Sequence, residues 1–167
     1  MEGLSNIYID NFLRSCHLRN YLGTFSSNNI PSLFHSQNEA SVIVNLSPVG
    51  TLGTHFISLM KQNEQYFLAD SLGLTWNDLP STIQMYVPSN VVIMYPIPLQ
   101  SLLSSFCGFY AILFILNFNT YNSTPGLIPF STQRNNDSIC LHNIHKIRKY
   151  IFDIIYICIT LVYHSTN

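Results

Sequence analysis

The stretch from Gln100 to Ile115, QSLLSSFCGFYAILFI, constrains the fold most strongly, because a polar lead-in runs directly into an unbroken apolar segment. The apolar window Phe106–Phe118 is 13 residues long, whereas a helix that crosses a membrane needs about 20. We therefore predict a buried helix that begins close to Cys107. A helix N-terminus offers unpaired N–H groups and partial positive charge, which favour a thiolate over a thiol. The alternative is a free cysteine that packs as a small hydrophobic residue.

Charged residues make up only 9% of the 167 residues, compared with about 25% in ordinary soluble domains, which raises the question of membrane association. The second apolar window, Ile151–Tyr163, is also too short to span a bilayer and contains Asp153. We predict a buried helix there, and a tail that binds a membrane surface is the alternative. Membrane insertion is not expected. The length is typical of one domain, residues 1–167, and we expect a monomer.

The net charge of −1 argues against a strong electrostatic interaction with nucleic acid. Four widely spaced cysteines form no CxxC or Cys/His metal pattern, so the sequence predicts no metal site. The N-terminus lacks the basic and apolar regions of a signal peptide. These features predict a protein that is not secreted and that works in a reducing compartment.

The hydrophobic pattern predicts an α+β domain with a cluster of strands between helices. Residues 5–22 have the pattern of an N-terminal helix, with Ser5 as its N-cap and Gly23 as its stop. Ala40–Leu46 has the continuous β-branched character of a central strand. The other predicted elements are strands at His55–Met60, Tyr66–Ala69 and Val91–Tyr95, helices at Asn77–Tyr86, about Ser105–Phe118 and Ile139–Tyr163, and a surface loop before the last helix. The short polar link after Met60 predicts a hairpin of the second and third strands.

Four residues could together form a site for thiol chemistry, which needs a nucleophile, a base, a group that orients the base, and oxyanion donors. Cys107 is the candidate nucleophile. His55 begins one predicted strand and Asp70 ends the next, so antiparallel pairing brings the carboxylate within reach of the imidazole. Gln100 precedes Cys107 by seven residues and can supply an amide donor. Taken alone, each of the three residues beside Cys107 also has a structural interpretation: His55 as a structural histidine, Asp70 as a turn residue and Gln100 as a polar loop residue.

The motifs around these positions resemble those of the adenovirus endopeptidase (adenain) family of cysteine proteases. The matching motifs, in order, are YLGTF at 21–25, ASVIVN at 40–45, GTHF at 53–56, YFLADSLG at 66–73, and Gln100 seven residues before CGF at 107–109. The resemblance covers residues 21–118, whereas the loop and C-terminal helix of residues 119–167 match loosely. It implies the adenain/SUMO-protease-like fold, with a central mixed sheet and the nucleophile at the N-terminus of a buried helix. It implies that His55, Asp70 and Cys107 are catalytic, and that Gln100 and the Cys107 backbone N–H form the oxyanion hole.

Chain order and flanking residues separate the related protease families. The order His…Asp…Cys is the reverse of the Cys…His…Asn order of papain-like enzymes. The SUMO-deconjugating proteases share the order found here, but they usually carry Asp where this chain has Phe106. Two residues depart from the adenain pattern: the acid is Asp70 instead of Glu, and Phe56 replaces the Trp after the catalytic His. Either carboxylate can orient an imidazole.

The resemblance implies an endopeptidase that cleaves viral capsid or core precursor proteins after Gly-containing motifs during virion maturation. The implied location is the virion and the nucleus or cytoplasm of the host cell. Adenovirus enzymes are activated by a disulfide-linked peptide and by DNA, but residues 88–91 hold no cysteine and basic residues are few. The sequence therefore requires no cofactor, DNA binding is not expected, and an activating peptide is implied by the resemblance alone. The alternatives are a deconjugase of ubiquitin-like modifiers and a non-enzymatic capsid or membrane-associated protein that retains the fold.

Overall fold

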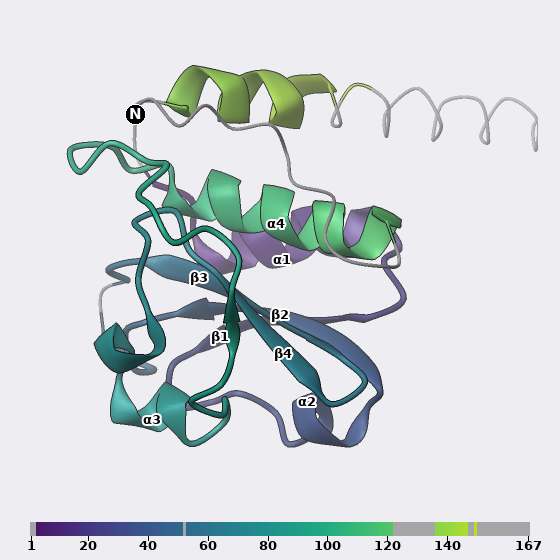
Figure 1. Cartoon of the computed structure of the whole chain (residues 1–167). Helices are drawn as coiled ribbons and strands as arrows, with labels where there is room; N and C mark the ends of the chain where they lie inside the picture. The colour runs from purple at the N-terminus through teal and green to yellow at the C-terminus, as the bar shows by residue number, and fades with distance from the viewer. Residues whose placement is uncertain (1–2, 52, 122–135, 147–148, 150–167) are drawn as a thin grey trace, which may run out of the picture.

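The structure, a computed structural model, describes residues 3–51, 53–121, 136–146 and 149. Its centre is a five-stranded sheet with the order β1-β2-β3-β4-β5, and helices lie on both faces of the sheet (Figure 1). The antiparallel strands are β2 (Glu39–Asn45), β3 (Phe56–Gln62) and β4 (Gln65–Ala69), while β1 (Tyr21–Ser26) runs parallel to β2 and β5 (Val92–Ile93) runs parallel to β4. The fold is therefore α+β with a mixed sheet, which confirms the predicted class.

The β3–β4 hairpin brings two distant sequence positions to one edge of the sheet. The strands are joined at Asn63-Glu64, and Asn63 has a φ of +53°, a left-handed conformation that Asn tolerates. The ladder pairs Ser58 near the start of β3 with Ala69 at the end of β4. Residues just before β3 and just after β4 therefore lie close together, as the predicted hairpin requires.

The central strands are buried on both faces, which explains their continuous apolar sequence. Val42 and Val44 of β2 face one core, and Ile43 between them faces the other. The first of these cores is covered by α2 (Leu33–Ser36) and α3 (Ser81–Gln84). The helices α1 (Asn6–Ser15) and α4 (Cys107–Tyr121) cover the opposite face (Figure 1).

The helix α4 is the buried helix that the sequence predicts, beginning at Cys107 and extending to Tyr121. Gly108 in its first turn allows α1 and the preceding segment to approach closely. A Cβ atom at this position would lie 3.1 Å from Ile9 Cδ1 and 3.1 Å from Leu4 Cβ. Because Gly108 has no side chain, the N-terminal segment can pack directly against the start of α4.

The N-terminal helix is shorter than predicted. It has the expected N-cap, since the hydroxyl of Ser5 accepts the N–H of Tyr8, but it ends at Ser15 instead of residue 22. Residues 21–26 form β1 because their backbone pairs with β2. Gly23 lies inside this strand with a φ of +146°, a conformation that favours glycine, so the prediction of a helix stop there was wrong.

Two further predicted elements are wrong in extent. The expected helix Asn77–Tyr86 is divided by Pro80 into a 3₁₀ turn at Trp76–Asp78 and the short α3, because proline lacks the N–H that a continuous helix needs. The expected strand Val91–Tyr95 is reduced to the two residues of β5.

Residues 137–146 form a helix that lies over α4 on the side away from the sheet (Figure 1). Its Cys140 and Ile144 pack into the same core as α4. The rest of the predicted helix Ile139–Tyr163, beyond residue 149, and most of the loop predicted before it lie outside the described residues. Within the described part of the chain, no helix is long and apolar enough to cross a membrane.

Candidate active site

His55 and Asp70 lie at one edge of the sheet, directly before β3 and directly after β4. His55 Nε2 and Asp70 Oδ1 form a hydrogen bond, and Asp70 is only 1% exposed. The other carboxylate oxygen, Oδ2, accepts the backbone N–H groups of Leu72 and Leu74, each at 2.9 Å. The turn after β4 therefore fixes the carboxylate, and the carboxylate fixes the imidazole.

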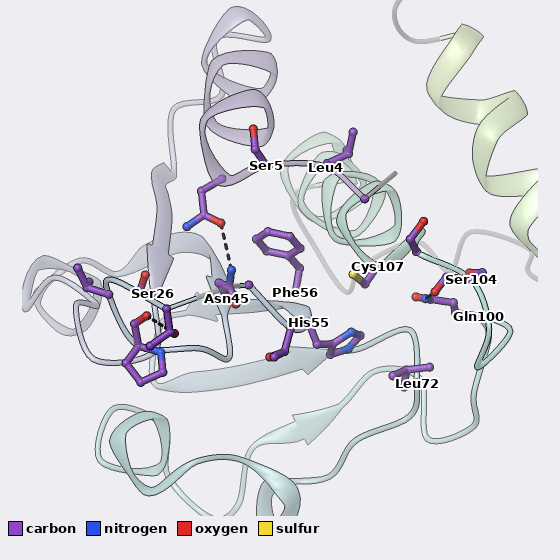
Figure 2. Close-up of a pocket in the computed structure, with 18 of the residues that line it drawn as sticks. Leu4, Ser5, Ser26, Asn45, His55, Phe56, Leu72, Gln100, Ser104 and Cys107 are labelled. Carbon is purple, nitrogen blue, oxygen red and sulfur yellow. Dashed lines mark hydrogen bonds between the residues drawn. The ribbon is translucent and has the colours of Figure 1, made fainter. Parts of the chain in front are cut away.

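Cys107 presents its sulfur to the imidazole of His55 from the start of α4 (Figure 2). Since Asp70 engages Nε2, Nδ1 is the ring nitrogen left for the thiol. Burial acts to lower the pKa of His55, but the hydrogen bonds with Asp70 and Cys107 outweigh it and raise the pKa to about 9. Burial acts to raise the pKa of the Cys107 thiol, but the hydrogen bond and positive charge of His55 outweigh it and lower the pKa. The geometry thus favours a thiolate–imidazolium pair.

Backbone N–H groups from two elements also favour the thiolate. The N–H groups of Phe56 and Gly108 interact with the Cys107 sulfur and help to lower its pKa. Phe56 is the first residue of β3, and Gly108 belongs to the first turn of α4. The sulfur therefore receives donors from the start of a strand as well as from the start of a helix.

The side-chain amide of Gln100 is held at both ends beside Cys107 (Figure 2). Its Oε1 accepts the hydroxyl of Ser71 at 2.7 Å, and its Nε2 donates to the backbone carbonyl of Ser104 at 2.7 Å. Because a carbonyl can only accept, this second bond determines which end of the amide is the nitrogen. The second hydrogen of Nε2 is then available to a substrate oxygen next to the thiol.

Ser71 is a residue of this site that the sequence reasoning treated only as part of a turn. It is 1% exposed, and its carbonyl accepts the backbone N–H groups of Leu99 at 2.8 Å and Gln100 at 2.9 Å. Together with its hydroxyl bond to Oε1, these contacts tie Gln100 to the turn that holds Asp70. Its place directly after the candidate acid was the available signal, but Ser after Asp is common in ordinary turns.

Three of the four predicted residues, His55, Gln100 and Cys107, line an open cleft of about 730 Å³. Asp70 is buried behind His55. Ser26 and Asn45 lie on one side of His55 and Cys107, and Gln100 lies on the other (Figure 2). The cleft therefore extends in both directions from the sulfur. This shape can hold an extended chain on both sides of a reacting carbonyl carbon.

The N-terminal segment, for which the sequence predicted a helix cap but no part in the site, forms part of the cleft wall. Gly3, Leu4 and Ser5 line the cleft together with Asn6, whose Oδ1 accepts a hydrogen bond from Asn45 Nδ2 at 3.2 Å. This bond joins the start of α1 to the end of β2. No local sequence signal reveals the contact, since the two residues are far apart along the chain.

No model of a protein family matches this chain, and no curated protein matches it significantly. The chemistry of the site is therefore argued from its geometry. Among the described residues, no three His, Cys, Asp or Glu side chains gather closely enough to hold a metal ion.

Proposed function

We propose that this chain is a cysteine endopeptidase with Cys107 as the nucleophile, His55 as the general base and acid, and Asp70 as the residue that orients the imidazole. One observation carries the proposal. His55 bridges a buried carboxylate and a thiol, and that thiol lies at a helix N-terminus inside an open cleft. This is the set of groups that activates a sulfur nucleophile.

In the first half of the proposed reaction, the proton of Cys107 resides on His55 and the thiolate attacks the scissile carbonyl carbon. The carbonyl oxygen becomes an oxyanion, which the Nε2–H of Gln100 and the backbone N–H of Cys107 stabilise. The imidazolium then gives its proton to the leaving amine as the C–N bond breaks. The product is a thioester between Cys107 and the acyl part of the substrate.

In the second half, the now neutral His55 takes a proton from water, which attacks the thioester carbonyl. The same donors stabilise the second oxyanion. Breakage of the C–S bond releases the acid and restores Cys107. Asp70 keeps Nδ1 directed at the sulfur through both steps.

The adenain-like fold and its substrates belong to the same proposal. The support for them is the order of His55, Asp70, Gln100 and Cys107 along a chain with a mixed sheet and a buried nucleophile helix. By this resemblance, the substrates are viral capsid or core precursor proteins cleaved after Gly-containing motifs during virion maturation. Cleavage takes place in the virion and in the host nucleus or cytoplasm.

A cleavage assay tests this function. The purified chain is offered Gly-Gly-type peptides and, separately, a folded ubiquitin-like modifier conjugated through its C-terminal Gly-Gly. We expect cleavage of the peptides that stops when the thiols are alkylated. Cleavage of the conjugate but of no peptide would select the deconjugase instead. No cleavage of either, together with a Cys107 that resists alkylation, would refute the proposal.

Ser71 has a positioning role in this mechanism, and Ser71→Ala tests it. Without the hydroxyl donor to Oε1, the Gln100 amide loses one of the two bonds that direct Nε2 toward the oxyanion. We expect kcat to fall about tenfold with little change in KM, less than the ~10²–10³ typical of losing an oxyanion donor outright. The measurement is steady-state peptide cleavage.

The matched control is Ser58→Ala, which removes another buried hydroxyl, one that donates to the Ala111 carbonyl at 3.1 Å and does not touch Gln100. It is expected to lower stability without a tenfold effect on kcat. In a Gln100→Ala background, Ser71→Ala should have no further effect on kcat, because the group that it positions is gone. Additive losses in the double variant would show that Ser71 does not act through Gln100.

A further inference from the structure

The cleft around Cys107 has an unusual lining. None of its described lining residues is Asp, Glu, Lys or Arg, and the ionisable groups that face it are His55 and Cys107. The other lining residues are mainly glycines, small hydroxyl or amide residues, and aliphatic residues such as Val49 and Leu102. Asp70 lies behind the imidazole and is 1% exposed, so its charge is directed at His55 and away from the cleft.

His55 and Cys107 also offer no uncompensated charge to a substrate side chain. His55 and Cys107 carry opposite charges in the ion-pair state and compensate each other. An ionised substrate side chain that enters the cleft therefore loses water and gains no partner of opposite charge among the described lining residues. Backbone groups and neutral polar side chains can exchange their water for the hydroxyl and amide groups of the wall.

We propose that the cleft is specific for an uncharged polypeptide segment, so that the residues flanking the scissile bond on both sides carry no ionised side chain. The proposal rests on the proposed peptidase function and adds the chemical class of its substrate. Charged residues are excluded by the cost of burial without a partner, and not by a repelling charge. Both signs of charge are therefore rejected.

The test is a charge scan of a peptide that the wild-type chain cleaves. At each of the two positions on either side of the bond, Asp is compared with Asn and Lys with Met, so that shape is nearly constant and charge changes. We expect kcat/KM to fall about tenfold or more for Asp and for Lys relative to their neutral counterparts.

A positive charge introduced into the cleft wall should allow substrates that carry a negative charge to bind. Val49 lines the cleft and is 60% exposed, so Val49→Lys adds a cation without disturbing the core. It should raise kcat/KM for Asp peptides at one or more positions, and not for Lys peptides. The matched control is Met85→Lys, which also converts an exposed apolar residue, 79% exposed, but lies outside the cleft and should rescue nothing.

The outcomes separate this inference from the peptidase function. If wild type cleaves the Asp and Lys peptides as well as the Asn and Met peptides, the inference is wrong and the function stands. Rescue by Met85→Lys equal to that by Val49→Lys would also overturn it, since the effect would then come from net charge. If no peptide is cleaved and Cys107 resists alkylation, the function fails and the inference fails with it.

Discussion

Replacing Cys107 with Ala is expected to reduce peptide cleavage at least ~10³-fold, to the level of the background. The reason is that the proposed reaction passes through a thioester on this sulfur, which Ala cannot form. Cys107 is partly exposed at the start of α4, so the loss of one sulfur atom there leaves the core packing intact. The measurement is the initial rate of peptide cleavage, with circular dichroism to show that the fold is kept.

Cys16→Ala is the matched control for this variant. Cys16 is also partly exposed and free. It lies directly after α1 and outside the cleft, and its thiol donates a hydrogen bond to the Phe12 carbonyl. This variant should cleave peptides at the wild-type rate. Retained cleavage in Cys107→Ala would contradict the assignment of the nucleophile.

Asp70→Asn is expected to reduce kcat/KM by about 10²-fold, less than the loss of Cys107 or His55. The N–H groups of Leu72 and Leu74 hold one oxygen of this side chain, so an Asn keeps its carbonyl oxygen there. Its NH₂ group then faces His55 Nε2. Nε2 must then accept a hydrogen bond from this NH₂ group, so the ring proton lies on Nδ1. A protonated Nδ1 cannot take the proton of Cys107.

The same variant should change the pH profile. In wild type, activity rises as Cys107 loses its proton and falls as the pH passes the His55 pKa of about 9. Removing the carboxylate removes a main cause of the raised pKa, so the alkaline limb of kcat/KM should move to lower pH. Glu64→Gln makes the same chemical change in the β3–β4 turn and should leave the profile unchanged.

Two results would oppose this account of Asp70. A loss in Asp70→Asn equal to that of Cys107→Ala, accompanied by lower thermal stability, would indicate a structural role for the carboxylate. A variant with wild-type activity and an unchanged alkaline limb would show that Asp70 does not control the imidazole.

The sequence predicts best those helices and strands whose continuous apolar pattern results from burial on both sides. Ala40–Leu46 and the helix after Cys107 are apolar because they are covered on both sides, and both are found within three residues of the predicted bounds. β1 was missed because residues 21–26 become a strand through parallel pairing with β2, a tertiary contact that their local pattern does not encode.

The geometry of the site could be anticipated in part for a similar reason. His55 and Asp70 flank a hairpin with a short link, so their proximity follows from strand pairing alone. Ser71 and the N-terminal wall could not be found in this way. Their roles depend on contacts with Gln100 and Asn45, which arise only when segments distant in sequence are packed together.

The central claim is that His55 holds Cys107 as a thiolate, and the pH dependence of alkylation measures this directly. Iodoacetamide labelling is followed at each cysteine by mass spectrometry. We predict that Cys107 reacts fastest, with a midpoint clearly below the ordinary thiol value of about 8.5, and that His55→Ala moves this midpoint upward. Cys16 and Cys140 should react slowly, because burial raises the pKa of both thiols. A Cys107 midpoint at or above 8.5, unchanged in His55→Ala, would contradict the account.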